Sequence, residues 1–151
     1  MIKIRKANRK DVKGLLDLIK ELATYEEQEQ HLKTDLNKII DSGFSNLQSP
    51  KFEALVAEID GVLIGYVTYT WNYSIWNGSK YMAIDDVFVS KQFRRHSIGV
   101  KLMQYAKDIC TSNNIELIKW EVESNNEKAI RFYKKLGAEV NNKSIVKWHI
   151  K

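Results

Sequence analysis

Apolar residues near the start of the chain recur with the period of a helix. Residues 2–5 alternate and predict a short strand, and a one-faced pattern with a period of about 3.6 residues then runs to about residue 25. Asn8 stands where a helix cap is expected, with Asp11 as its partner in a capping box. This part of the chain therefore predicts a strand followed by an amphipathic helix.

The middle of the chain has the patterns of strands. Residues 52–59 and 62 to about 71 are typical of two strands, and Asp60-Gly61 between them is a strong signal for a hairpin turn. Residues 81–89 form a third, mostly apolar run. The sequence thus predicts a hairpin followed by a third strand.

The remaining elements complete the order β-α-α-β-β-β-α-β-α-β. This order predicts an α/β or α+β domain with a mixed sheet. The other expected elements are a short helix capped by Thr34 and ended by Gly43, loops over residues 45–51 and 72–79, a helix from Ser97 to about Thr111, a strand over residues 115–123, a helix capped by the segment 124–126 and ended by Gly137, and a last strand over residues 145–150.

A short basic loop separates the third strand of the middle region from the helix after it. Arg94, Arg95 and Lys101 bring positive charge to the start of that helix, where the first N–H groups have no internal partner. Gly99 lets an anion approach the backbone, and Ser97 offers a cap and a hydroxyl. The residues alone fit a phosphate site and an ordinary solvated helix start equally well.

Two carboxylates interrupt the apolar strand just before this loop. Neighbouring strand residues point to opposite faces, so only one of Asp85 and Asp86 faces a cleft unless a bulge intervenes. The structural interpretation is one ion-paired and one exposed aspartate, because a buried carboxylate is costly without a partner. The functional interpretation is an acid–base site.

Composition limits the class of protein. The chain has 151 residues, 44% of them hydrophobic, which is enough for one domain over residues 1–151 with its own core. The formal net charge of +5 favours anionic partners. Nucleic acid is not expected, because acidic residues near Tyr25 and Asp85 would repel phosphates. The lone cysteine, Cys110, lies beside an apolar helical row and is expected to be a core thiol.

The sequence also indicates a compartment. The first residues contain no apolar signal segment, and no apolar run approaches the roughly 20 residues that span a bilayer, so a cytoplasmic protein without a membrane partner is expected. His31, His96 and His149 show no metal-ligand spacing, so no metal is expected.

Two segments together resemble a known family. Residues 94–99, Arg-Arg-His-Ser-Ile-Gly, match the acetyl-coenzyme A motif (Q/R)-x-x-G-x-(G/A) of the GNAT acetyltransferases, with Ser97 in place of the first glycine. Residues 126–138 resemble the family's N-x-x-A-x-x-(F/L)-Y-x-x-x-G-(F/A) helix. The similarity extends from Ile2 to about Trp148. It implies the GNAT fold, with a mostly antiparallel central sheet flanked by helices.

Within the family the chain is most similar to the spermidine/spermine branch, which includes thialysine acetyltransferases. The segments that carry this similarity are residues 18–26, 76–78, 85–89 and 132–138. The branch has Glu-Asp where this chain has Asp85-Asp86. The resemblance implies an enzyme that moves acetyl from acetyl-CoA to a polyamine or another diamine-like small molecule, and it implies a homodimer.

The resemblance also implies roles for individual residues. Tyr133 is the expected general acid for the leaving thiolate, although the pattern alone fits a core tyrosine as well. Asp85 is the expected general base, and Asp86 the group that holds a second ammonium of the substrate. The expected coenzyme contacts are Val87, Phe88, Val89, Arg94, Arg95, His96, Ser97, Ile98, Gly99, Val100, Lys101, Asn126 and Lys135; further expected substrate contacts are Tyr25, Glu26 and Trp76.

Two other functions stay open. One is a GNAT enzyme that acts on a protein or peptide amine, or on an antibiotic. The other is a non-catalytic module that binds acyl-CoA for regulation, which the Ser97 departure permits.

Overall fold

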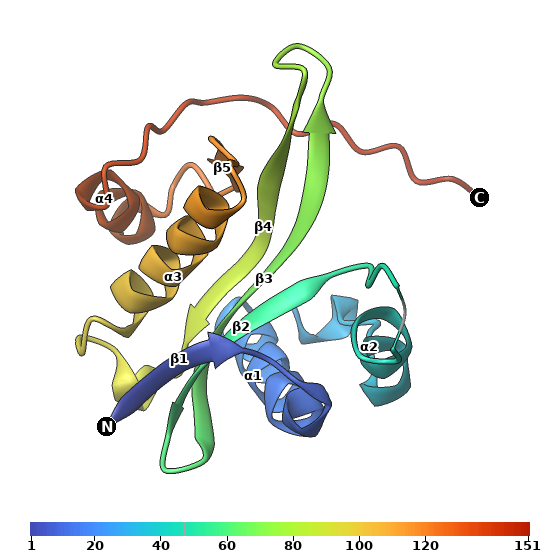
Figure 1. Ribbon diagram of the computed structural model, residues 1–151, viewed down its shortest axis with the longest axis vertical. Coiled ribbons are helices and arrows are strands. Elements are labelled where there is room, and N and C mark those ends of the chain that lie inside the picture. The colour runs from blue at the N-terminus through green and yellow to red at the C-terminus, as the bar shows by residue number, and fades with distance from the viewer. Residues whose placement is uncertain (47) are drawn as a thin grey trace. The chain divides into compact units, whose positions relative to one another are not determined.

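A five-stranded sheet forms the framework of the N-terminal part of the chain (Figure 1). The computed structural model describes residues 1–46 and 48–151, in two compact units, Met1–Trp120 and Glu121–Lys151. The sheet has the order β1-β2-β3-β4-β5; all pairs are antiparallel except β4 with β5. The strands are β1 (Ile2–Lys6), β2 (Glu53–Ile59), β3 (Val62–Ser74), β4 (Ser79–Val89) and β5 (Ile118–Lys119). This confirms the mixed, mostly antiparallel sheet.

The hairpins follow the sequence signals, but one is longer than expected. Asp60 and Gly61 have φ angles of +50° and +80°, which a two-residue turn between β2 and β3 requires. The loop predicted over residues 72–79 is shorter, because Asn72 pairs with Tyr81 and Ser74 with Ser79. The long β3–β4 hairpin of Figure 1 is the result.

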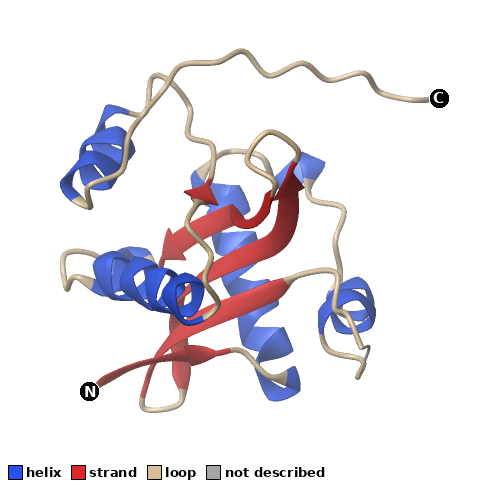
Figure 2. Ribbon diagram, turned by 45° about the horizontal axis from the view of Figure 1, so that its top comes forward, coloured by secondary structure: helices blue, strands red, loops and turns tan. Residues whose placement is uncertain are grey.

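Helices cover both faces of this sheet (Figures 1 and 2). The helical segments of this unit are η1 (Arg9–Asp11), α1 (Val12–Tyr25), η2 (Glu29–His31), α2 (Leu36–Gly43), η3 (Lys91–Phe93) and α3 (Ile98–Ser112). On the α1 side, Leu15 packs in one core with Tyr66 of β3 and Phe88 of β4. On the α3 side, Cys110 Sγ lies 4.0 Å from Met82 Sδ. Burial raises the pKa of the Cys110 thiol, which confirms a core cysteine.

The helix caps confirm one prediction and correct another. The side chain of Asn8 accepts a bond from the Lys10 amide at 2.9 Å, and Asp11 accepts one from the Asn8 amide at 2.7 Å, which completes the predicted capping box. The cap of α2 is Asp35, whose Oδ1 accepts from the Lys38 amide at 2.8 Å. The prediction of Thr34 was wrong by one residue, since the next position also carries a capping side chain.

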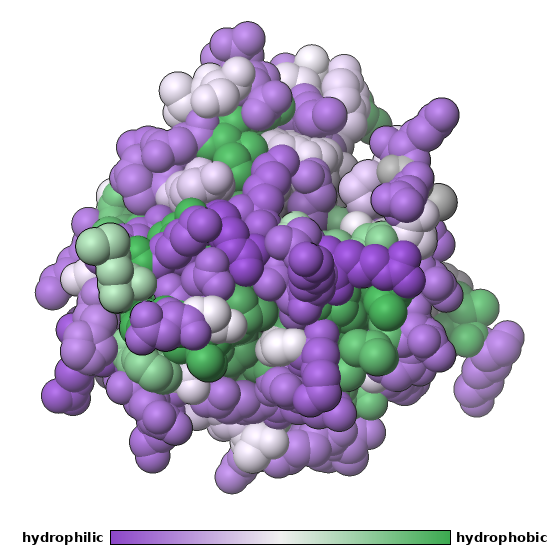
Figure 3. Space-filling model, turned by 60° about the horizontal axis from the view of Figure 1, so that its bottom comes forward, coloured by the Kyte–Doolittle hydropathy of each residue, from purple (hydrophilic) through white to green (hydrophobic). Residues whose placement is uncertain are grey.

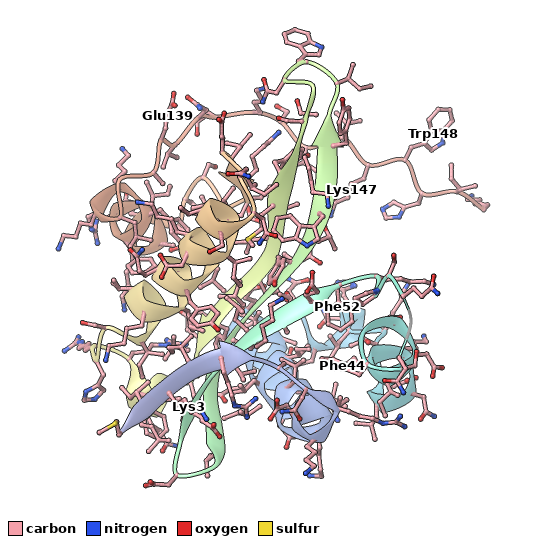
Figure 4. All side chains as sticks on the ribbon, in the orientation of Figure 1. Lys3, Phe44, Phe52, Glu139, Lys147 and Trp148 are labelled. Atoms are coloured by element: carbon pink, nitrogen blue, oxygen red, sulfur yellow. The ribbon has the colours of Figure 1, made fainter. Side chains whose placement is uncertain are left out.

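The segment after α2 returns the chain to the sheet. The rings of Phe44 and Phe52 meet edge to face at 5.9 Å and join the end of α2 to the start of β2 (Figure 4). The described residues of the predicted loop over 45–51 contain no helix or strand; residue 47 lies outside the described part.

The C-terminal unit, residues 121–151, contains one helix, α4 (Glu127–Lys135). Asn126 caps it, with its Oδ1 accepting from the Ala129 amide at 3.1 Å, and Gly137 follows its end with φ +95°. The strand predicted over residues 145–150 is absent from the described structure, as is all of the one over 115–123 except β5. A strand forms only where a partner strand supplies its hydrogen bonds. Trp148, in the segment over 145–150, is 88% exposed (Figure 4).

The surface is mainly polar. On the face shown in Figure 3, hydrophilic residues cover most of the area and apolar ones form small patches between them. Among the described residues, no helix is both long enough and apolar enough to cross a bilayer.

Candidate active site

A β-bulge in β4 creates an acidic cluster. Thr68 of β3 pairs with Asp86 and the next residue, Tyr69, pairs with Ile84, so Asp85 is the extra residue of β4. The bulge re-aims the two aspartate side chains, as the sequence analysis allowed. Asp85 is exposed and Asp86 is half-buried.

Asp86 lies in an environment that opposes its negative charge. Burial, together with the negative charges of Asp85 and Glu26, raises the pKa of Asp86 to about 6. The hydroxyl of Tyr66 donates to Asp86 Oδ2 over a long 3.4 Å and partly offsets this. Within residues 1–46 and 48–120, no lysine, arginine or histidine forms an ion pair with these three carboxylates.

Tyr66 bonds to a carboxylate of the acidic cluster, and no sequence pattern singled it out. Its ring is fully buried against Phe88, with 6.2 Å between ring centroids. Burial and the charge of Asp86 raise the pKa of the Tyr66 phenol, so the hydroxyl stays protonated. The only signal in the sequence was a hydroxyl-bearing aromatic residue inside an apolar strand.

Arg94 lies between two aromatic rings. Its guanidinium carbon is 4.5 Å from the ring centroid of Tyr25, at the end of α1, and 5.5 Å from that of Phe88. Its Nε donates to the carbonyl oxygen of Val89 at 3.0 Å. The side chain therefore joins the basic loop to α1 and to the end of β4.

The backbone of the basic loop has an unusual conformation. Arg95 and Ser97 have φ angles of +72° and +59°, in the left-handed region that glycine adopts without strain. A glycine at position 97, as in the family motif, fits this geometry. Ser97 occupies the N-cap position of α3, as predicted, but its side chain makes no capping bond. Its left-handed backbone differs from the extended conformation of a capping residue.

The start of α3 leaves donors available. The first bond into the helix runs from the Lys101 amide to the Ser97 carbonyl at 3.0 Å. The amides of Ile98, Gly99 and Val100 precede it and have no partner within the helix. Ile98 is 2% exposed and anchors this turn in the core, whereas His96 and Lys101 are exposed.

Part of the β4 edge is open. β5 pairs only with Met82 and Ala83, so within residues 1–46 and 48–120 no strand pairs with residues 84–89 on that side. The side chain of Phe88 points into the core. The groups that residues 87–89 leave available at the open edge are therefore their backbone N–H and C=O groups. This edge leads directly to the basic loop.

Another missed residue, Glu21, fixes the start of the loop. Its Oε1 accepts a 2.7 Å bond from the Ser90 hydroxyl and a 3.4 Å bond from the Lys91 amide. No local pattern marked this glutamate, because its partners are about seventy residues away in the chain.

The structure does not bring Trp76 to the acidic cluster. Trp76 is 99% exposed in the turn between β3 and β4. Asp85 lies six residues beyond Ser79 along β4, a distance of about 20 Å in an extended strand. The extra length of the hairpin separates them.

The predicted site residues of the C-terminal unit lie on or beside α4. Tyr133 is half-buried, and its ring contacts Phe132 at 5.4 Å between centroids. Asn126 uses its side-chain oxygen to cap the helix, and Lys135 is exposed in its last turn. Their roles stay predictions.

Other features of the described residues do not compete with this site. Two surface hollows, of about 310 and 640 Å³, involve Trp71 with Lys80 and Gly14 with Phe93, and neither includes the acidic cluster. No group of three His, Cys, Asp or Glu side chains is arranged to hold a metal ion in the described part of the chain.

Comparison with known proteins identifies the family. The model of the acetyltransferase (GNAT) family matches residues 13–138. A thialysine N-epsilon-acetyltransferase from Mus musculus is 29% identical over 145 residues, covering 91% of this chain and 84% of its own length.

Solved structures agree on the fold. An aminoglycoside acetyltransferase from a soil metagenomic sample, in complex with trehalose, has a TM-score of 0.82 at 17% identity, covering 99% of this chain and 96% of its own. An aminoglycoside N-acetyltransferase in complex with CoA has a TM-score of 0.78 at 19% identity, covering 99% and 95%. The chain described here belongs to the GNAT acetyltransferase family and is an acyltransferase enzyme.

Proposed function

We propose that this enzyme transfers acetyl from acetyl-CoA directly to a primary amine of a polyamine or a similar small polycation. The observation that carries the proposal is the acidic cluster of Glu26, Asp85 and Asp86, which has no cationic partner in its own unit and adjoins an open strand edge. Three neighbouring negative charges favour a ligand with two or more positive charges. The similarity to thialysine acetyltransferases supports the same substrate class.

The donors of the basic loop fit the coenzyme. The partnerless amides at the start of α3 would bind its diphosphate, with Arg95, His96 and Lys101 adding positive charge or donors. The open β4 edge over residues 87–89 would hydrogen-bond the extended pantetheine arm. By resemblance, Asn126 and Lys135 complete the coenzyme contacts.

We assign the base to Asp86 and the second ammonium to Asp85. The resemblance implied the reverse, with Asp85 as the base and Asp86 as the group that holds the second ammonium. Half-burial and a pKa of about 6 favour Asp86 as base, because such a carboxylate is ionised near neutral pH yet more basic than an ordinary aspartate. The exposed Asp85 can hold a distal cation of the substrate at the surface.

The chemistry then needs only proton transfers and positioning. The ammonium gives up one proton, through water, to Asp86, and the neutral nitrogen attacks the thioester carbonyl. The carbon–nitrogen bond forms, the carbon–sulfur bond breaks and Tyr133 gives its phenol proton to the leaving thiolate, while the second proton of the nitrogen passes through water to restore the phenol. The net result is an acetamide, a free coenzyme thiol and one proton released to solvent.

Release of the coenzyme thiol tests the proposal. The purified protein is mixed with acetyl-CoA and a panel of polyamines, lysine analogues, peptides with free N-termini and aminoglycosides. Preference for polyamines or lysine analogues supports the proposal. Preference for peptides or aminoglycosides refutes the substrate class, and coenzyme binding without turnover of any amine would indicate a binding module.

Tyr133→Phe tests the acid role. Turnover should fall by about 100-fold or more, with little change in coenzyme affinity. Tyr73→Phe, on the exposed part of the β3–β4 hairpin, is the matched control.

We also propose a homodimer on the basis of the resemblance. Sedimentation at two protein concentrations distinguishes a dimer from a monomer.

A further inference from the structure

The contacts of Arg94 are those of a clamp. Its guanidinium is in contact distance of the Tyr25 and Phe88 rings, and its Nε is bonded to the Val89 carbonyl. A planar guanidinium stacks on aromatic faces and donates in fixed directions, so these contacts define its position. The side chain is half-buried, unlike its exposed neighbour Arg95.

Tyr25 is the last residue of α1, and the chain reverses directly after it. Glu27 has φ +55°, its amide donates to the Thr24 carbonyl at 3.1 Å, and the Gln28 amide donates to the Ala23 carbonyl at 2.8 Å. This pair of bonds is a Schellman closure, which ends a helix in a fixed geometry. Glu26 lies between Tyr25 and Glu27, the residue at which the chain reverses, so its position depends on the last turn of α1.

Glu26 belongs to the acidic cluster. Its charge acts on both Asp86 and Tyr66. Tyr25 itself is 60% exposed, so few core contacts hold it in place. Together with the bonds of Glu21 to Ser90 and Lys91, the stack of Tyr25 with Arg94 joins this part of α1 to the basic loop.

We infer that Arg94 is a positioning residue for the amine site: by contacting the rings of both Tyr25 and Phe88, it holds the end of α1 so that Glu26 lies with Asp85 and Asp86. The inference rests on the proposed function for its catalytic consequence, although the clamp itself does not. It assigns Arg94 a role different from phosphate binding, which the sequence motif suggests.

Hydrogen exchange tests the clamp without any activity. The amides of Glu27 and Gln28 report on the closure of α1. Arg94→Lys keeps the charge but removes the planar stack, so exchange in residues 22–32 should be faster by about 3- to 10-fold. Tyr25→Leu should have the same effect, the double variant no larger one, and Tyr25→Phe should resemble the unchanged protein.

Arg9→Lys, at an exposed position in η1, is the matched control and should leave this exchange unchanged. Unchanged exchange in Arg94→Lys, or effects of Arg94→Lys and Tyr25→Leu that multiply in the double variant, would overturn the clamp.

Kinetics then separates the two roles of Arg94. In Arg94→Lys, KM for a diamine should rise about 3- to 10-fold, while kcat and the dissociation constant for coenzyme A stay within about twofold. Weaker coenzyme binding with an unchanged KM for the amine would mean that Arg94 binds phosphate, and the inference would be wrong. If no amine is turned over by the unchanged protein, the proposed function fails and the exchange data alone decide on the clamp.

Discussion

Two clusters of acidic residues beside the sheet differ in whether a cation lies among them. In the first, which we call the paired cluster, Arg5 of β1 holds Asp11 and Glu58. Its Nη1 and Nη2 bond to the two carboxylate oxygens of Asp11 at 2.7 and 2.9 Å, and its Nε bonds to Glu58 at 2.9 Å. The bonds to Arg5 lower the pKa of the Asp11 carboxyl.

The second, the unpaired cluster, contains the same residue types without an arginine. Asp86 is half-buried beside Asp85 and Glu26, and burial and these charges raise its pKa to about 6. Arg94 is near, but it contacts Tyr25 and Phe88 rather than a carboxylate.

The two clusters contrast a carboxylate held by an arginine with a carboxylate that has like charges as neighbours. A buried carboxylate with a bidentate arginine contributes stability, whereas one among like charges costs stability in the free enzyme. A polycationic substrate would remove this cost when it binds.

The largest effect is expected for Asp86→Asn on catalysis. The amide cannot accept the ammonium proton, so kcat/KM for a diamine should fall by about 100- to 10,000-fold. The measurement is the initial rate of thiol release near neutral pH. Asp41→Asn, at an exposed position of α2, is the control and should retain full activity. A loss of less than tenfold would remove Asp86 from the role of base.

How far the sequence anticipated these clusters depends on the range of the interactions. The Asn8–Asp11 capping box, the Asp60-Gly61 turn and the first four strands follow from local patterns, and the structure confirms them; the expected last strand over residues 145–150 is absent from the described residues. The length of the β3–β4 hairpin was not predicted, because polar residues such as Asn72 join the ladder only through their partners on the other strand.

The site was predictable in part for the same reason. The sequence placed Asp85 and Asp86 in one strand and allowed for a bulge between them. It did not reveal Tyr66 or the contact of Arg94 with Tyr25, because these depend on residues distant in the chain. A cluster of like charges also cannot be recognised from a local sequence pattern, because only the fold brings Glu26 close to β4.

The next largest effect is expected for Asp11→Asn on stability. The change leaves Arg5 without its bidentate partner and weakens the capping box, so the free energy of unfolding should fall by about 2–3 kcal/mol near neutral pH. Because the folded pKa of Asp11 is lowered, its contribution is present above the unfolded pKa of about 4 and is lost as the pH falls through the folded value. Urea unfolding at several pH values should therefore show the two proteins converging in acid, and a constant difference would contradict the ion pair.

Asp86→Asn is expected to raise the free energy of unfolding, the opposite of the effect expected for Asp11→Asn. The raised pKa of Asp86 means that the folded state binds its proton more tightly than the unfolded chain does, so the group costs stability as the pH rises from about 4 to about 6. The variant should be more stable than the unchanged protein by about 1–2 kcal/mol at neutral pH, after allowance for partial exposure, and equally stable below about pH 4. Destabilisation at neutral pH would mean that Asp86 has a stabilising partner, and the contrast between the clusters would disappear.

The smallest effect is expected when the like charges around Asp86 are removed singly. In the pH dependence of kcat/KM, an acid limb with an apparent pKa of about 6 should report the ionisation of Asp86. Glu26→Gln should shift this limb to lower pH by about half a unit or less, and Asp85→Asn should shift it further, because Asp85 has the larger influence on the pKa of Asp86. Glu27→Gln is the control, since Glu27 does not contribute to that pKa.

The order of the three shifts matters more than their size, because salt screens exposed charges to different degrees. If Glu26→Gln behaves like Glu27→Gln, Glu26 lies outside the cluster, and the raised pKa follows from burial and Asp85 alone. If Glu26→Gln does shift the limb, the same substitution is then made in the Arg94→Lys variant. There it should shift the limb less, because a displaced Glu26 no longer raises the pKa of Asp86. The paired and unpaired clusters would then differ both in their cation and in how the fold holds them, one by direct bonds to Arg5 and the other by an arginine that touches no carboxylate.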